Sequence, residues 1–251
     1  MASPITTAAT SAVPPAQDSV RYGPALTLLA TLFFMWGFIT VINNTLLPHL
    51  RSVFELSYTQ TTLIESVWFI AYFVASLPSA KLIERIGYQK SLVAGLGIMA
   101  VGALGMVLAA RLPSYGVTLA ALFVIASGIT LLQVAANPYV AVVGKPETAS
   151  SRLNLVQAFN SLGTTLAPLF GGYLILGRSA SGTAAAGAAA LTPAQRLADA
   201  QAVQLPYLIV AATLVVLAIV IARFPLPAMG AATQRAAKQE RKRHSLWKHR
   251  N

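Results

Sequence analysis

The stretch LLQVAANPYV, from Leu131 to Val140, lies inside a long apolar segment and yet carries two carboxamide side chains and a proline. The apolar segment covers 116–142, and a helix needs about 20 such residues to cross the hydrocarbon core of a bilayer. A polar group in hydrocarbon costs several kcal/mol unless it is hydrogen-bonded. The stretch therefore predicts a transmembrane helix on which Gln133 and Asn137 meet a polar partner instead of lipid.

The composition of the whole chain indicates a membrane protein. Of its 251 residues, 56% are hydrophobic and 10% are charged, and the mean hydropathy is +0.65, outside the range of ordinary soluble domains. The chain has no cysteine and three scattered histidines, so neither a disulfide framework nor a metal site is expected. The apolar segments contain no carboxylate pair and no nucleophile–base arrangement, so we expect neither enzyme activity nor a cofactor.

Six segments are long and apolar enough to cross a bilayer, and we predict an all-α membrane protein with six transmembrane helices. Several prolines lie near the predicted ends, where helix boundaries are hardest to place. The predicted spans are 25–47, 60–80, 91–111, 116–142, 153–176 and 205–222. They form a bundle over 25–224, between a disordered leader (1–24) and a basic tail (225–251).

The positions of Lys and Arg predict the orientation of this bundle. Cytoplasmic loops retain these residues, and 14 of the 18 in the chain fall on one side of the predicted spans. We therefore expect a multi-pass protein of the cytoplasmic (inner) membrane with both termini in the cytoplasm. This asymmetry accounts for the net charge of +11, so a nucleic-acid partner is not expected, although the basic tail can also contact anionic lipid.

Polar residues within the predicted spans are concentrated in three of the six helices. In each helix most of them recur at intervals of three, four or seven residues, which places their side chains on one face. Prolines follow the amides of the first and fourth spans, where they free backbone carbonyls. The residues concerned are Trp36, Thr40, Asn43 and Asn44 in the first span, Gln133 and Asn137 in the fourth, and Asn154, Gln157, Asn160 and Ser161 in the fifth.

These polar faces allow two interpretations. Amides can join transmembrane helices, at about 0.6–2 kcal/mol per hydrogen-bonded pair, and for any single Asn this explanation is as good as a binding role. The concentration of amides on three faces favours a shared, water-filled cavity instead. An amide donates and accepts at once and so bridges vicinal hydroxyls, while an indole packs on the C–H face of a pyranose. The pattern therefore indicates a site for a sugar.

Three longer segments carry specific motifs: FFMWGFITVINNTLLP (33–48), LLQVAANPYVAVVGKPE (131–147) and SSRLNLVQAFNSLGTTLAP (150–168). They closely resemble the fucose permease and glucose/galactose transporter family of the major facilitator superfamily. AKLIERIGYQK (80–90) is similar to the superfamily's loop motif. Glu84, Arg85 and Gly87 take its acidic, basic and turn positions, whereas Ala80 and Tyr88 replace its usual Gly and Arg.

The resemblance implies that the six helices are one half of a major facilitator fold, built from two inverted three-helix repeats. It also implies a substrate site for a sugar in the central cavity. The site residues that it implies are Trp36, Asn43, Asn44, Gln133, Asn137, Gln157 and Asn160.

The resemblance leaves the coupling ion open between sodium and a proton. Proton-coupled fucose permeases of the family carry an Asp and a Glu where this chain has Asn44 and Gln133, and amides do not titrate. The pattern is more similar to the glucose/galactose branch, in which sodium coupling is also known. Glu65 is the one carboxylate within a predicted span, and a charge at mid-bilayer costs about 2.5–3.5 kcal/mol, so Glu65 is a candidate for ion coupling.

Members of the superfamily have two six-helix halves with the substrate between them, whereas this chain has six predicted spans. We therefore expect an N-terminal half that transports a hexose by alternating access together with a C-terminal half or a second copy. Glucose or galactose is the expected substrate, with fucose as a further candidate. The alternatives are a non-transporting membrane subunit, in which the amides only join helices, and an exporter of another small molecule, which would more often show a wide apolar cavity.

Overall fold

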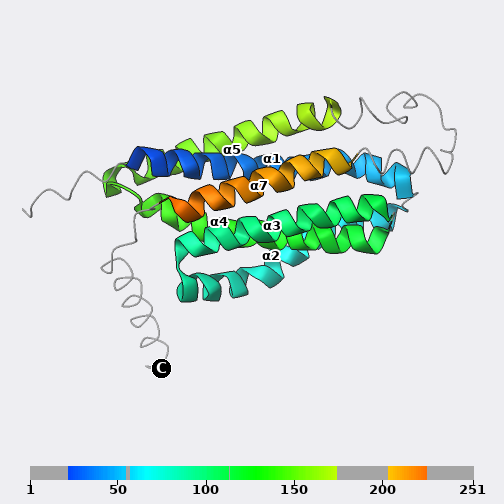
Figure 1. Cartoon of the computed structure of the whole chain (residues 1–251), viewed down its shortest axis with the longest axis horizontal. Helices are drawn as coiled ribbons and strands as arrows, with labels where there is room; N and C mark the ends of the chain where they lie inside the picture. Colours follow the sequence, from blue (N-terminus) through cyan, green and yellow to red (C-terminus); the bar gives the residue numbers. More distant parts are fainter. Residues whose placement is uncertain (1–21, 55–56, 113, 174–202, 225–251) are drawn as a thin grey trace, which may run out of the picture.

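The structure is a computed structural model that describes residues 22–54, 57–112, 114–173 and 203–224, and these residues are almost entirely helical (Figure 1). A short 3-10 turn (Pro146–Thr148) precedes the fifth long helix. The long helices are α1 (Tyr22–Phe54), α2 (Tyr58–Ile86), α3 (Tyr88–Arg111), α4 (Tyr115–Val142), α5 (Ala149–Gly171) and α7 (Gln204–Arg223). The predicted basic tail (225–251) and the leader up to residue 21 lie outside the described residues, and 22–24, also assigned to the leader, begin α1 instead.

Three helices continue through proline, and for α1 this makes the helix longer than its predicted span. Helix α1 extends to Phe54, past Pro48, whereas the predicted span ended at residue 47. Helices α2 and α4 likewise continue through Pro78 and Pro138. Proline removes one backbone hydrogen bond, but irregular backbone facing lipid would leave many more groups unsatisfied. Helical continuity is therefore the less costly state in apolar surroundings.

Five helices in the described part of the chain are long and apolar enough to cross a membrane: α1, α2, α3, α4 and α7. Helix α5 has 23 residues, which gives a length of about 35 Å at 1.5 Å per residue. It is long enough to cross a membrane but less apolar than the other five helices, because it carries the polar residues of RLNLVQAFNSLG. Its place in the membrane therefore depends on what covers those residues.

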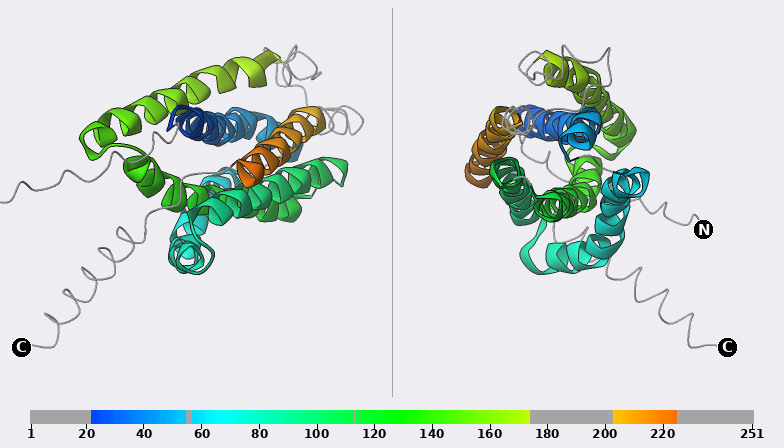
Figure 2. Two further views of the ribbon diagram at one scale, coloured as in Figure 1. Left: turned by 60° about the vertical axis from the view of Figure 1, so that its left-hand side comes forward. Right: turned by 90° about the vertical axis from the view of Figure 1, so that its right-hand side faces the viewer.

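The helices pack in a specific order (Figure 2). Helix α3 lies along α4 on one side and along α7 on the other. Helix α5 packs on α1, and α2 packs on α4, while α1 also touches α4 and α7. The first helix of each predicted three-helix repeat is thus paired with the second helix of the other repeat.

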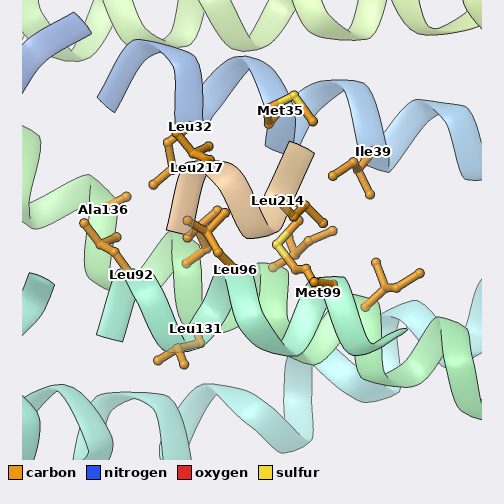
Figure 3. Packing of buried hydrophobic residues seen from close by; sticks show 14 of the residues in the cluster. Leu32, Met35, Ile39, Leu92, Leu96, Met99, Leu131, Ala136, Leu214 and Leu217 are labelled. Carbon is orange, nitrogen blue, oxygen red and sulfur yellow. The ribbon is translucent and has the colours of Figure 1, made fainter. Parts of the chain in front are cut away.

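The core of the bundle lies between α1, α3, α4 and α7, where aliphatic side chains and methionines interdigitate (Figure 3). Small residues bring α3 and α4 together, as is common where helices pack inside a membrane. A Cβ atom added to Gly102 would lie 2.7 Å from the backbone nitrogen of Ile125, and one on Gly128 would lie 2.8 Å from the carbonyl oxygen of Gly95. The two helices therefore approach closely along much of their length.

The α2–α3 turn, the α4–α5 connection and the C-terminal end of α7 lie at the same end of the bundle (Figure 1). Gly87 makes the α2–α3 turn with φ +82°, a value that L side chains rarely adopt. Glu84 and Arg85 are exposed in the last turn of α2. The side-chain nitrogen of Gln89 donates to the carbonyls of Ile221 and Phe224 at 2.8 and 2.9 Å, which ties this turn to the end of α7.

Candidate functional site

Asn160 lies where α5 crosses α1. Its side-chain nitrogen donates to the carbonyl oxygen of Phe33 at 2.9 Å, and the side chain is half-buried. Gly37 makes room for it, because a Cβ atom there would contact both the backbone and the side chain of Asn160. Part of the hydrogen-bonding capacity of Asn160 therefore joins two helices, which is the structural role that the sequence left open for any single amide.

Trp36 lies on the turn of α1 that Asn160 meets. Its indole is half-buried and rests on Phe33, with the ring centroids 5.3 Å apart and the planes at 58°. The hydroxyl of Thr40 donates to the carbonyl of Trp36 at 2.9 Å, so this threonine bonds within its own helix. Trp36 is thus held in place by packing while part of its surface stays accessible.

The outer surface of α5 is divided into an apolar flank and a polar flank. At 100° per residue, the residues buried against α1, such as Val156 and Gly163, separate the two. Leu155, Phe159, Leu162 and Leu166 are exposed on one flank, and Asn154, Gln157 and Ser161 are exposed on the other. Lipid suits only the first flank, so water or protein must cover the second.

The amides of α4 face α2. The side-chain nitrogen of Gln133 donates to the hydroxyl of Tyr72 in α2 at 3.4 Å. The side-chain nitrogen of Asn137 donates to the backbone carbonyl of Gln133 at 3.1 Å. All three side chains are half-buried, so Gln133 and Asn137 form one polar surface with a tyrosine that the sequence analysis did not single out.

The remaining site residues lie in α1 and α2. Asn44 is exposed near the C-terminal part of α1, whereas the side chain of the neighbouring Asn43 lies outside the described residues. Glu65 is exposed in α2. It follows the start of the helix by seven residues, about 10 Å along the axis, because α2 begins at Tyr58 and not at the predicted residue 60.

Arg152 is a buried cation at the α4–α5 connection, with 7% of its surface exposed. Its guanidinium donates to the carbonyls of Val140, Ala141 and Lys145 at 3.2, 2.9 and 2.8 Å, and to the hydroxyl of Thr148 at 2.6 Å. A helix end leaves carbonyls without intrahelical partners, and a cation satisfies them. Arg152 is one of the 14 Lys and Arg residues on the predicted cytoplasmic side, and no pattern in the sequence indicated that it also caps α4 and bonds to the residues before α5.

Two chemical features describe the polar side chains of the described ranges. No group of three or more His, Asp or Glu side chains in these ranges could hold a metal ion. The polar side chains on the polar flank of α5 and on the α4 surface are mainly amides and hydroxyls, and such groups recognise hydroxylated solutes by hydrogen bonds.

A bundle of long apolar helices with amides on selected flanks defines a multi-pass α-helical membrane protein. The sequence model of the Major Facilitator Superfamily matches residues 27–250. The chain belongs to this superfamily of transporters, which is not a family of enzymes.

Similar proteins give a more detailed comparison. A glucose/galactose transporter of Brucella abortus (biovar 1, strain 9-941) is 49% identical over 231 residues, which cover 92% of this chain and 53% of the relative. The L-fucose-proton symporter of Escherichia coli K12 is 34% identical over 228 residues, covering 89% of this chain and 52% of the symporter. The crystal structure of the transporter FucP in the outward conformation matches with a TM-score of 0.71 and 33% identity, over 82% of this chain and 51% of that one. The chain thus spans about half the length of the relatives that it matches.

Proposed function

We propose that this chain is the N-terminal, six-helix half of a hexose carrier that works by alternating access in the cytoplasmic membrane. The observation that carries the proposal is the polar flank of α5, where Gln157 is exposed on a helix whose other flank is apolar. The substrate class follows from the Brucella abortus relative, which is a glucose/galactose transporter. L-Fucose is a further candidate, since the Escherichia coli relative is an L-fucose-proton symporter.

The proposed site combines the two polar surfaces of the bundle. Asn160, which bonds to Phe33 of α1, supplies the α1 side together with Trp36, and Gln157 lies about one turn before Asn160 on α5. Gln133 and Asn137 supply the α4 side. Asn44, which is exposed in the C-terminal part of α1, and Asn43 complete the proposed set of site residues. In this site the amides bridge the sugar hydroxyls and the indole packs on the C–H face of the ring. A hydroxylated ligand replaces water on these groups, so the exchange costs little.

A second half is the proposed partner, as a C-terminal half or a second copy. Pairing α5 with α1 and α2 with α4 is the arrangement that two inverted repeats, 25–111 and 116–222, produce. The polar flank of α5 then faces the partner and the substrate, while the leucine flank faces lipid. This arrangement also places α5 across the membrane as the sixth span.

The proposed orientation has both termini in the cytoplasm. The α2–α3 turn and the α4–α5 connection share one end of the bundle (Figure 1), and in or close to them lie Lys81, Arg85, Lys90 and Lys145. A concentration of Lys and Arg at one end is typical of the cytoplasmic side. The loop motif of Glu84, Arg85 and Gly87 then belongs to the cytoplasmic face.

The matched pair Gln157→Ala and Asn160→Ala tests the proposed site. We expect Gln157→Ala to weaken hexose binding at least tenfold without changing the melting temperature, because Gln157 is exposed. Asn160→Ala should weaken binding and also lower the free energy of unfolding by about 1 kcal/mol, because its bond to Phe33 is lost. Binding of radiolabelled galactose and glucose, with fucose as competitor, would be measured on the chain co-expressed and co-purified with the second half of the Brucella abortus relative.

Leu155→Ala is the control for this pair, since it alters the opposite flank of the same helix. It should leave binding unchanged. A co-purified complex that binds none of these hexoses would refute the proposed function. Loss of stability without loss of binding in both amide variants would support the non-transporting subunit instead.

Glu65 is the proposed coupling residue, for sodium or for a proton. We expect Glu65→Gln to abolish ion-driven accumulation while retaining hexose exchange, because the amide cannot titrate and carries no charge. Stability should be unchanged, since Glu65 is exposed. Uptake into proteoliposomes of the same complex, measured against pH and sodium and compared with counterflow, checks this. An unaltered ion dependence in Glu65→Gln would exclude the role.

A further inference from the structure

The contact between Tyr72 and Gln133 joins α2 to α4 within the apolar bundle. The amide nitrogen of Gln133 donates to the phenolic oxygen of Tyr72 at 3.4 Å. The ring of Tyr72 also lies beside Trp68, one turn earlier in α2, with the centroids 6.5 Å apart. Tyr72 is therefore positioned by packing as well as by the hydrogen bond, and it is half-buried like its partner.

The hydrogen-bonding groups of the pair are only partly used by this contact. A glutamine amide has an NH₂ donor and a carbonyl acceptor, and a tyrosine hydroxyl both donates and accepts. With the amide nitrogen on the phenolic oxygen, Oε1 of Gln133 remains as an acceptor and the O–H of Tyr72 remains as a donor. With the amide turned over, Nε2 remains as a donor and the phenolic oxygen as an acceptor. Either orientation leaves at least one donor and one acceptor side by side.

A role limited to joining helices leaves these groups unsatisfied. An unpaired polar group in apolar surroundings costs about 1–3 kcal/mol, and the pair leaves at least one donor and one acceptor. Asn137, one turn further along α4, uses its nitrogen on the carbonyl of Gln133, which leaves its Oδ1 on the same surface. The surface formed by Tyr72, Gln133 and Asn137 therefore matches a ligand that both donates and accepts.

We propose that Tyr72 and Gln133 together bind hydroxyl groups of the hexose, which makes Tyr72 a specificity-determining residue of the carrier. This inference rests on the proposed function and extends the site to α2. A sugar hydroxyl, or two vicinal ones, donates to the acceptor of the pair and accepts from its donor. Tyr72 also holds the amide of Gln133 in place, so the two residues act as a unit.

The test is Tyr72→Phe, which removes one oxygen atom and keeps the ring against Trp68. In the complex described above, we expect the Kd for the hexose to rise about five- to tenfold, as for the loss of one hydrogen bond. A series of monodeoxy glucose and galactose analogues identifies the hydroxyl concerned. The unaltered chain should bind one of these analogues five- to tenfold more weakly than its parent sugar, and Tyr72→Phe should not distinguish the two.

Tyr58→Phe is the matched control, because it removes the same atom from a residue of α2 that is 80% exposed; it should bind as the unaltered chain does. Gln133→Met is the second single variant of a double-mutant cycle. The double variant Tyr72→Phe with Gln133→Met should have a Kd for the hexose less than twofold higher than that of Gln133→Met alone. Tyr72→Met, a second hydroxyl-free variant, replaces Tyr72→Phe if the latter is not recovered folded.

Two results would overturn the inference while leaving the proposed function intact: wild-type affinity of the Tyr72 variant for every sugar, or an equal loss for all analogues. The first removes any role in binding, and the second indicates a structural role. A complex of the unaltered chain that binds no hexose instead refutes the proposed function. Loss of binding in Gln133→Met together with unchanged binding in Tyr72→Phe would assign the hydroxyl contact to Gln133 without Tyr72.

Discussion

Replacing Arg152 with alanine is expected to lower the free energy of unfolding by about 3 kcal/mol. The guanidinium makes four hydrogen bonds, to three carbonyls and one hydroxyl, and bonds from a charged donor are stronger than neutral ones. Alanine leaves the carbonyls of Val140 and Ala141, at the end of α4, without these partners. The site residues of α4 and α5 lie on either side of this junction, so hexose binding by the complex should fall as well.

Lysine should restore only part of the lost stability. It keeps the positive charge near the helix end but cannot reproduce the planar fork that reaches several carbonyls at once. Thermal unfolding in detergent, followed by circular dichroism, measures the differences among Arg152→Ala, Arg152→Lys and the unaltered chain. Lys90→Ala is the control, because Lys90 is exposed and its loss should change stability by less than about 0.5 kcal/mol. A melting temperature of Arg152→Ala equal to that of the control would show that the cap contributes nothing.

Gly163→Ala is expected to separate α5 from α1, at a cost of about 3 kcal/mol, the upper end of ordinary overpacking. A Cβ atom at this position would contact the backbone carbonyl of Phe34 and would lie 3.0 Å from the backbone nitrogen of Phe38. Backbone atoms within a helix cannot move aside as a side chain can, so the whole of α5 must shift. The shift would also break the hydrogen bond of Asn160 to α1.

Hydrogen exchange of the α5 amides, together with thermal unfolding, measures this effect. Protection in α5 should fall while protection in α3 and α4 persists, since those two helices pack on each other. Gly97→Ala is the matched control: it also adds one methyl group to a helix, but nothing lies within 4 Å of the new atom. Alanine favours helix over glycine by about 1 kcal/mol, so this variant should be as stable as the original chain or slightly more so. Equal melting temperatures for the two alanine variants would contradict the close packing of α1 and α5.

The polar residues of α5 show which features of a site can be predicted from helical periodicity alone. Helical spacing correctly placed Gln157 and Ser161 on one side of the helix, because the angle between residues of one helix is fixed by its geometry. It also grouped Asn160 with them, whereas Asn160 is half-buried against α1 and donates to Phe33. Which residues belong to the polar flank depends on how α5 is rotated against the neighbouring helix. The spacing of residues along the chain does not determine that rotation.

The ends of the helices near proline were predicted less well than the positions of residues on a helix face. The first span was predicted to end at residue 47, next to Pro48, where the boundary was hard to place, and α1 continues to Phe54. Proline is a strong helix breaker where water can take up the freed backbone groups, and a weaker one where no such alternative exists. Composition identified the environment, but the boundary depended on the balance of backbone hydrogen bonds in it.

The sequence by itself determined that the chain forms long apolar helices and that amides gather on a few of their faces, because both properties follow from residues close together in the chain. Only the tertiary structure decided which polar groups are used between helices. Gln133 meets a partner 61 residues away, and Asn160 meets one 127 residues away. Asn160 and Phe33 are brought together where Gly37 and Gly163 let α1 and α5 approach closely, and such packing depends on the shapes of both helices at once. The role of an amide in this protein is therefore fixed by the helix opposite it and not by its own neighbours in the chain.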